Sequence, residues 1–147
     1  MLKETLIEIF ERDLQKLITE VKLYKDEDNL WLVKEGISNS AGNLCLHLVG
    51  NLNHFIGAIL GNTGYVRYRD DEFNLKNVLR QDLLLNIGNC ALIVKSTLKN
   101  LPDEELEKDF PVDVFGKKVS TEFMLVHLST HLTYHLGQIN YHRRLLD

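Results

Sequence analysis

The chain has 147 residues, a formal net charge of −4, and hydrophobic and charged shares of 44% and 26%. These values are typical of one soluble domain with one continuous core, so we treat residues 1–147 as a single domain. The acidic balance argues against a nucleic-acid partner, and no uninterrupted apolar run approaches the roughly 20 residues that span a bilayer. The acidic N-terminal segment MLKETLIEIFERD does not resemble a secretory signal. We therefore expect a cytoplasmic protein with no membrane partner.

Apolar residues first recur at helical spacing over residues 2–24, which predicts a helix there. A charged loop and the stretch LWLVKEGISNS follow. The next predicted helix runs from Ser40, a residue type suited to an N-cap, to about residue 60, where the run GNTG ends it. The segment YVRYRDDEFN after it is polar, and we expect it to be irregular.

The third predicted helix spans residues 75–101, with Asn74 as its cap and Pro102 beyond its end. Residues 109–120 alternate apolar and polar side chains around a glycine, which predicts a short hairpin or an extended loop. The fourth helix is expected from Ser120 or Thr121 to about residue 145. Four helices of this length with modest connections predict an all-α four-helix bundle.

Four of the six histidines lie in the last predicted helix: His127, His131, His135 and His142. Their spacings of four, four and seven keep them within an arc of about 80° on one helix face. Buried ring nitrogens need hydrogen-bond partners, and adjacent protonated rings repel one another. A divalent metal ion removes both problems, because it takes the neutral ring as its ligand.

The second predicted helix carries its own polar stripe: Asn43, His47, Asn51 and His54. No Asp, Glu, Lys or Arg occurs from residue 39 to residue 65, so this helix is expected to be buried on most sides. Two histidines four residues apart can bind one ion together with a third from a facing helix. The candidates are His47 or His54 with two of the last-helix histidines at 127, 131 and 135. Spacing alone does not choose among them, and it also allows a metal-free, hydrogen-bonded histidine core.

The last helix excludes two kinds of metal site. It has no carboxylate from residue 123 to residue 146, so it contains neither the H-E-x-x-H motif of metalloproteases nor the Glu-x-x-His pairs of di-iron bundles. The predicted site is rich in imidazole and poor in carboxylate, which favours one ion with open coordination positions.

Three segments carry a resemblance to a known family. HLTYHLGQ, residues 131–138, is similar to the last-helix signature of the DinB-like superfamily, and LHLVGNLNHFIG and YVRYRDDEF resemble its DUF1572 branch. The resemblance implies a DinB-like bundle of up-up-down-down topology, often a homodimer. It also implies a divalent ion (zinc, nickel, iron or manganese) held by His47, His131 and His135.

The other polar residues are then expected around this ligand set. Gln138 and Asn51 could orient a ligand ring or a bound water, or make a hydrogen bond within the bundle. We predict that His127 lies beside the ligands or in a pocket, and that His54 and His142 are structural or pocket-rim residues. Cys45 is expected to be a small core residue. Arg67, Arg69 and Arg144 could bind an anion, but the expectation for them is a solvated surface position.

Characterised members of the superfamily include metal-dependent transferases that use low-molecular-weight thiols. The resemblance therefore predicts a metal-dependent thiol S-transferase acting on a small-molecule substrate. A metal-dependent hydrolase is the alternative, although the sequence offers no carboxylate base beside the histidines. A non-catalytic, metal-stabilised binding protein is the third possibility.

Overall fold

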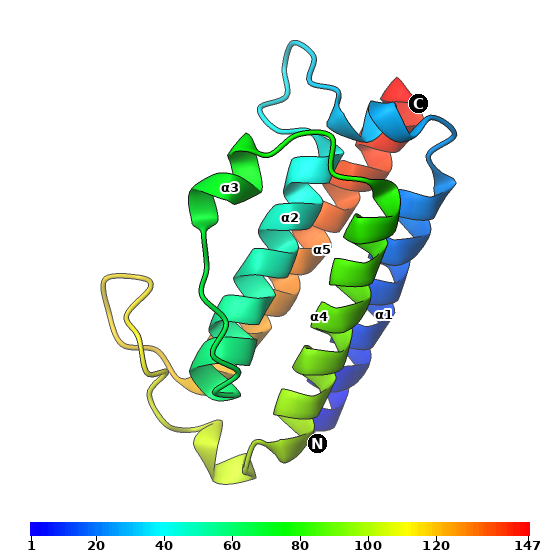
Figure 1. Cartoon of the computed structure of the whole chain (residues 1–147). Coiled ribbons are helices and arrows are strands. Elements are labelled where there is room, and N and C mark those ends of the chain that lie inside the picture. The colour runs from blue at the N-terminus through cyan, green and yellow to red at the C-terminus, as the bar shows by residue number, and fades with distance from the viewer.

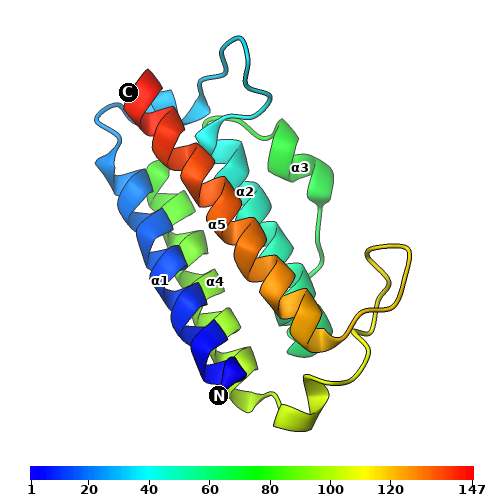
Figure 2. The ribbon, with the colours of Figure 1, turned by 180° about the vertical axis from the view of Figure 1, so that it is seen from behind.

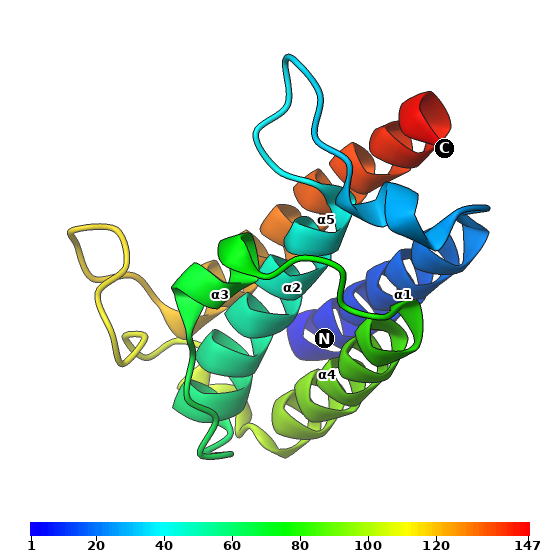
Figure 3. The ribbon, with the colours of Figure 1, turned by 45° about the horizontal axis from the view of Figure 1, so that its top comes forward.

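The computed structural model covers residues 1–147 and consists of helices joined by loops (Figure 1). The long helices are α1 (Leu2–Leu23), α2 (Ala41–Leu52), α4 (Arg80–Asn100) and α5 (Thr121–Leu146), and α2 continues as a π-helical segment, η2 (Asn53–Leu60). The short ones are α3 (Arg69–Asn74) and the 3-10 helices η1 (Glu27–Trp31) and η3 (Asp103–Glu105). Helices α1 and α2 occupy opposite corners, each packed between α4 and α5 (Figure 3). The predicted all-α four-helix bundle is confirmed.

The directions of the helices follow from contacts between their ends. Lys3 Nζ donates to the carbonyl of Leu101 at 3.0 Å, which makes α1 and α4 antiparallel. The backbone N–H of Lys25 donates to Asp147 at 2.8 Å, so the ends of α1 and α5 meet (Figure 2). In chain order the helices run up, down, down and up, which differs from the up-up-down-down order that the resemblance implied. The physical reason is that residues 24–40 turn the chain back at one end, whereas the segment after η2, which carries α3, runs along the bundle.

Two predicted elements have different boundaries. The third long helix begins at Arg80, not at residue 75, and Asn74 does not cap it. Residues 75–79 continue the apolar spacing without being helical, and the carboxylate of Glu27 accepts the N–H of Arg80 in place of a local cap. Residues 69–74, expected to be irregular, form α3.

The helix starts at Ser40 and Ser120 agree with those predicted from the sequence. Ser40 Oγ accepts from the N–H of Asn43, and Ser120 Oγ from that of Phe123, each at 3.1 Å, so both serines cap their helices. Residues 109–120 form an extended loop closed by one isolated bridge between Asp109 and Ser120.

The helix formed by α2 and η2 is the most apolar element of the bundle. Residues Ala41–Leu60 have the length and composition of a membrane span, but 61% of the relevant window is buried inside the structure. Leu48, Leu52 and Ile56 are fully buried within a core of 27 apolar residues. Burial against α3, α4 and α5 explains why this helix carries no charged residue.

Candidate metal centre

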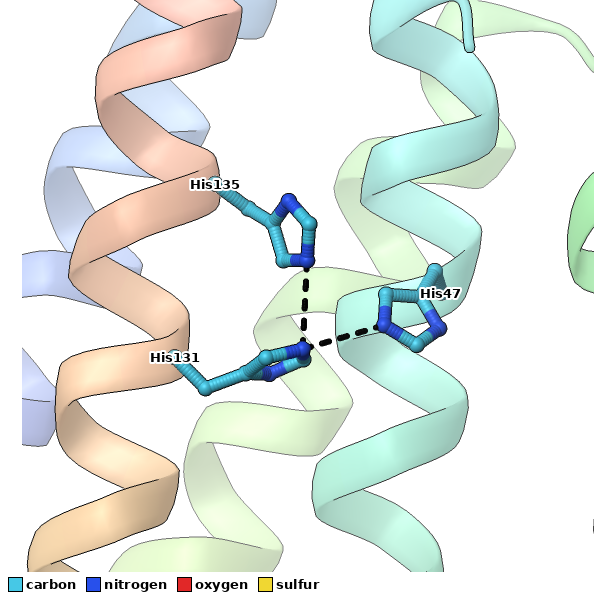
Figure 4. A group of neighbouring side chains, drawn as sticks. All are labelled: His47, His131 and His135. Atoms are coloured by element: carbon cyan, nitrogen blue, oxygen red, sulfur yellow. Dashed lines mark hydrogen bonds between the residues drawn. The ribbon is translucent and has the colours of Figure 1, made fainter. Parts of the chain in front are cut away.

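Three histidine rings from two helices meet inside the bundle (Figure 4). His47 projects from α2, and His131 and His135 project from successive turns of the antiparallel helix α5. His131 Nε2 lies 3.2 Å from Nε2 of His47 and 3.1 Å from Nε2 of His135. All three potential ligand atoms lie within 4.8 Å of one another. The structure thus brings together the three histidines that the resemblance selected.

The outer nitrogens of two rings fix the tautomers of those rings. Nδ1 of His47 donates to Oε1 of Glu72 at 3.0 Å, and Nδ1 of His135 donates to Oε1 of Gln138 at 2.7 Å. A neutral imidazole carries only one proton, so the Nε2 atoms of both rings present lone pairs to the centre. His131 Nδ1 is buried and has no partner. Lone pairs that converge from neutral rings are the donor set that a divalent metal ion needs.

Glu72 is a carboxylate at this site that the sequence reasoning missed. It is buried, with 6% of its side chain exposed, and comes from α3. Arg67 binds it through two hydrogen bonds, from Nε at 2.8 Å and from Nη2 at 2.9 Å. Both residues belong to the motif YVRYRDDEF, which served only as a family signature in the sequence analysis. The three converging ligand atoms are all imidazole nitrogens, and Glu72 adds one carboxylate behind the His47 ring. The expectation of a solvated Arg67 was wrong.

Helix α3 packs closely on one face of α2. A Cβ atom on Gly50 would lie 1.9 Å from Oε2 of Glu72, so a larger residue there cannot coexist with this carboxylate position. Asn43 Nδ2 donates to the carbonyls of Glu72 and Leu75 at 2.9 and 2.8 Å. Phe73 packs on His47, with ring centroids 5.0 Å apart. The polar stripe of α2 therefore holds α3 as well as supplying a ring.

Electrostatics favour the neutral form of His131 and His135 and the ionised form of the Glu72 carboxylate. Burial, together with the neighbouring imidazoles, lowers the pKa of His131 to about 4. Burial also lowers the pKa of His135, although its bond to Gln138 acts in the opposite direction. Burial raises the pKa of Glu72, but the hydrogen bonds from His47 and Arg67 outweigh it, and the net pKa is lowered. At neutral pH, competition between protons and a metal for His131 and His135 is weak.

The remaining histidines lie outside this group of three. His127 stacks against His131 with ring centroids 6.2 Å apart, one turn before the site. His54 is half-buried against Phe55. His142 donates from Nε2 to the carbonyl of Leu32 at 2.9 Å, so its Nδ1 accepts from the Tyr24 hydroxyl at 2.6 Å. His142 therefore fastens α5 to the chain after α1.

The remaining residues named in the sequence analysis differ in how they relate to the three rings. Asn51 is buried one turn beyond His47, but its Oδ1 has no partner, and Glu72 holds the His47 ring instead. Gln138 accepts a hydrogen bond from His135, and its role in orienting a metal ligand stays a prediction. Arg69 and Arg144 lie over aromatic rings of their own helices and are exposed. Cys45 is fully buried in the core, as expected.

Comparisons with known proteins agree with this architecture. Residues 3–147 match the family described as "protein of unknown function (DUF1572)". The chain belongs to the DUF1572 family. Its fold is similar to the crystal structure of a DinB-like protein from Bacillus subtilis, with a TM-score of 0.70 and 18% identity over 95% of this chain and 90% of that one. No curated protein matches the chain.

Proposed function

We propose that this DUF1572 protein binds one divalent metal ion through His47, His131 and His135 and transfers a low-molecular-weight thiol to a small electrophile. The observation that carries the proposal is the convergence of three Nε2 atoms: those of His47 and His135 lie 3.2 and 3.1 Å from that of His131, and the tautomers of His47 and His135 are fixed from outside. Metal sites commonly orient their imidazole ligands through such outer hydrogen bonds. Zinc, nickel, iron and manganese all remain candidates.

The residues around the rings define what the site can do. When bound, a divalent ion held by neutral imidazoles retains its positive charge and favours the deprotonated form of a thiol. Glu72 and Gln138 orient the rings, and Phe73 covers one side of His47. In the transfer, the thiol proton passes to solvent, the sulfur bonds to an electrophilic carbon, and the leaving group departs with the electron pair of its broken bond.

A metal-dependent hydrolase is less well supported. Such an enzyme needs a base that can accept a proton from water. Glu72 is the nearest carboxylate to the rings, but His47 and Arg67 already occupy both of its oxygens. It is therefore a positioning residue and not a free base.

The experiment that tests metal binding is elemental mass spectrometry of the purified, tag-free protein. We expect near-stoichiometric metal in the wild type and its loss from the His131→Ala/His135→Ala variant. His47→Ala should also lose the metal, whereas His54→Ala, the matched control two turns further along the same helix, should keep it. A wild type that neither contains metal nor takes up added zinc, nickel or manganese would contradict the proposal. A metal-loaded wild type would then be assayed for transfer with a panel of thiols and electrophiles.

We also propose a cytoplasmic location, which two free and buried cysteines support. The homodimer implied by the family resemblance stays a prediction, and sedimentation velocity would test it. Exposed apolar side chains on α5, such as Phe123 and Val126, are consistent with a contact between copies.

A further inference from the structure

A cavity of about 660 Å³ opens beside the candidate metal centre. It lies between the loop of residues 34–39 and the C-terminal half of α5, and His135 and Gln138 form part of its wall. Its volume is within the range of sites that hold small organic molecules. A molecule in this cavity would lie against the ring of His135 and therefore next to the metal site.

The lining of the cavity is mainly apolar and aromatic. Ile37 and Leu44 contribute aliphatic surface from the loop and α2, and Leu145 does so from the end of α5. Tyr134 and Tyr141 stand two turns apart on α5, and they are 65% and 63% exposed. Tyr134 packs edge-on against His135, and Arg144 lies over the Tyr141 ring, so each tyrosine keeps an exposed surface on which a ligand can stack. Exposed tyrosines that converge on one hollow indicate a site for a flat, apolar group.

The charges around the cavity argue against an anionic occupant. Lys34 and Glu35 are the only residues of the lining with formal charges, and the two charges cancel. No arginine lines the cavity, and Arg67 is engaged by Glu72. Recognition of carboxylate or phosphate groups normally needs an unpaired cationic fork or cluster.

We infer that this cavity binds the neutral, aromatic electrophile that accepts the thiol, and not the thiol itself. That the ligand reacts as an electrophile rests on the proposed function. That the ligand is neutral and aromatic rests on the lining of the cavity alone. The two can therefore fail separately.

The binding experiment uses 1,3-dinitrobenzene, a neutral aromatic probe without a leaving group, and follows backbone amide shifts by NMR. We expect saturable shifts in residues 34–39 and 134–146.

The Ile37→Arg variant places a charge in the cavity and should weaken binding about tenfold or more. Val33→Arg is the matched control, because Val33 is exposed in the same loop but does not line the cavity. Tyr141→Ala removes a ring that is expected to stack on the probe, so it should also weaken binding. Shifts confined to other regions, or equal affinity in Ile37→Arg and Val33→Arg, would overturn the inference.

The kinetic experiment uses metal-loaded protein, L-cysteine and 1-chloro-2,4-dinitrobenzene. Cysteine sulfur bonds to the ring carbon, chloride leaves with the electrons of the C–Cl bond, and the thiol proton passes to buffer. Ile37→Arg should raise the KM for the electrophile about tenfold with unchanged metal content, and Val33→Arg should not. Transfer with an unchanged KM in Ile37→Arg would overturn the cavity inference and leave the proposed function standing. Saturable binding without any metal-dependent transfer would reject the proposed function and leave the neutral aromatic site standing.

Discussion

Nδ1 of His47 donates a hydrogen bond of 3.0 Å to Oε1 of Glu72, a residue 25 positions further along the chain. This contact joins α2 to α3 and makes the segment after η2 part of the candidate metal centre. Arg67 completes the arrangement by binding both oxygens of the same carboxylate. The orientation of the His47 ring therefore depends on the docking of a six-residue helix.

Glu72→Gln tests this dependence. Removal of the charge weakens the bond to His47 and the pair with Arg67, so we expect metal affinity to fall about 10- to 100-fold while the bundle remains folded. A competition titration with a chromophoric chelator measures the change. Asp71→Asn is the control, because Asp71 is exposed in the same helix and should have no effect. Equal affinities for the two variants would mean that Glu72 does not support the ligand ring.

Gly50→Ala should reproduce the effect without altering a polar group. The new Cβ would stand 1.9 Å from Oε2 of Glu72, so the carboxylate must move away from its present position. We expect metal affinity to fall by a factor similar to that for Glu72→Gln. Gly88→Ala is the matched control, because Gly88 also lies within a long helix and has no atom within 4 Å of an added Cβ. That control should keep metal binding and gain about 0.5–1 kcal/mol of stability from helix propensity.

Periodicity predicted the long helices because their apolar faces pack on one core. It did not predict the start of α4 or the π-helical turns of η2, for two different physical reasons. Val78 and Leu79 continue the apolar spacing of α4 without being helical, because Glu27, more than fifty residues away in the sequence, caps the helix at Arg80. The π-helical turns of η2 share the composition of an α-helix, so residue types alone do not distinguish them.

At the site, histidine spacing narrowed the rings on α5 to two of His127, His131 and His135, and the partner on α2 to His47 or His54. The family resemblance chose His47, His131 and His135, and the structure places the His47 ring against His131. Glu72 escaped prediction because its role depends on a fold-back contact that no periodic pattern encodes. The one available signal was an arginine and a glutamate five residues apart inside the motif YVRYRDDEF.

Gln138→Ala should weaken metal binding less than Glu72→Gln does. Gln138 holds Nδ1 of His135 at 2.7 Å, but it is neutral and exposed, so water can replace it. We expect an affinity loss of less than about tenfold in the same chelator competition. A loss larger than that of Glu72→Gln would show that His135, and not His47, is the ring whose orientation limits metal binding.

We expect Glu20 to make the bundle sensitive to acid, at a distance from the candidate metal centre. Its carboxylate accepts bonds from Arg143 at 2.6 Å and Asn140 at 2.7 Å, with 12% of the side chain exposed. Burial raises its pKa, but these partners outweigh burial and hold the pKa below its ordinary value of 4.5. A carboxyl group whose pKa is lowered on folding stabilises the folded state at pH values above its unfolded-state pKa. This stabilisation is lost as the pH falls through the folded-state pKa.

Glu20→Gln should therefore lower the free energy of unfolding by about 1–3 kcal/mol at about pH 7, and the difference from wild type should shrink at about pH 3. Thermal unfolding at both pH values measures it, with Glu8→Gln as the control, because Glu8 is exposed on the same helix and has no ion pair. A destabilisation of Glu20→Gln that is equal at both pH values would show that the ion pair between α1 and α5 does not control the acid response.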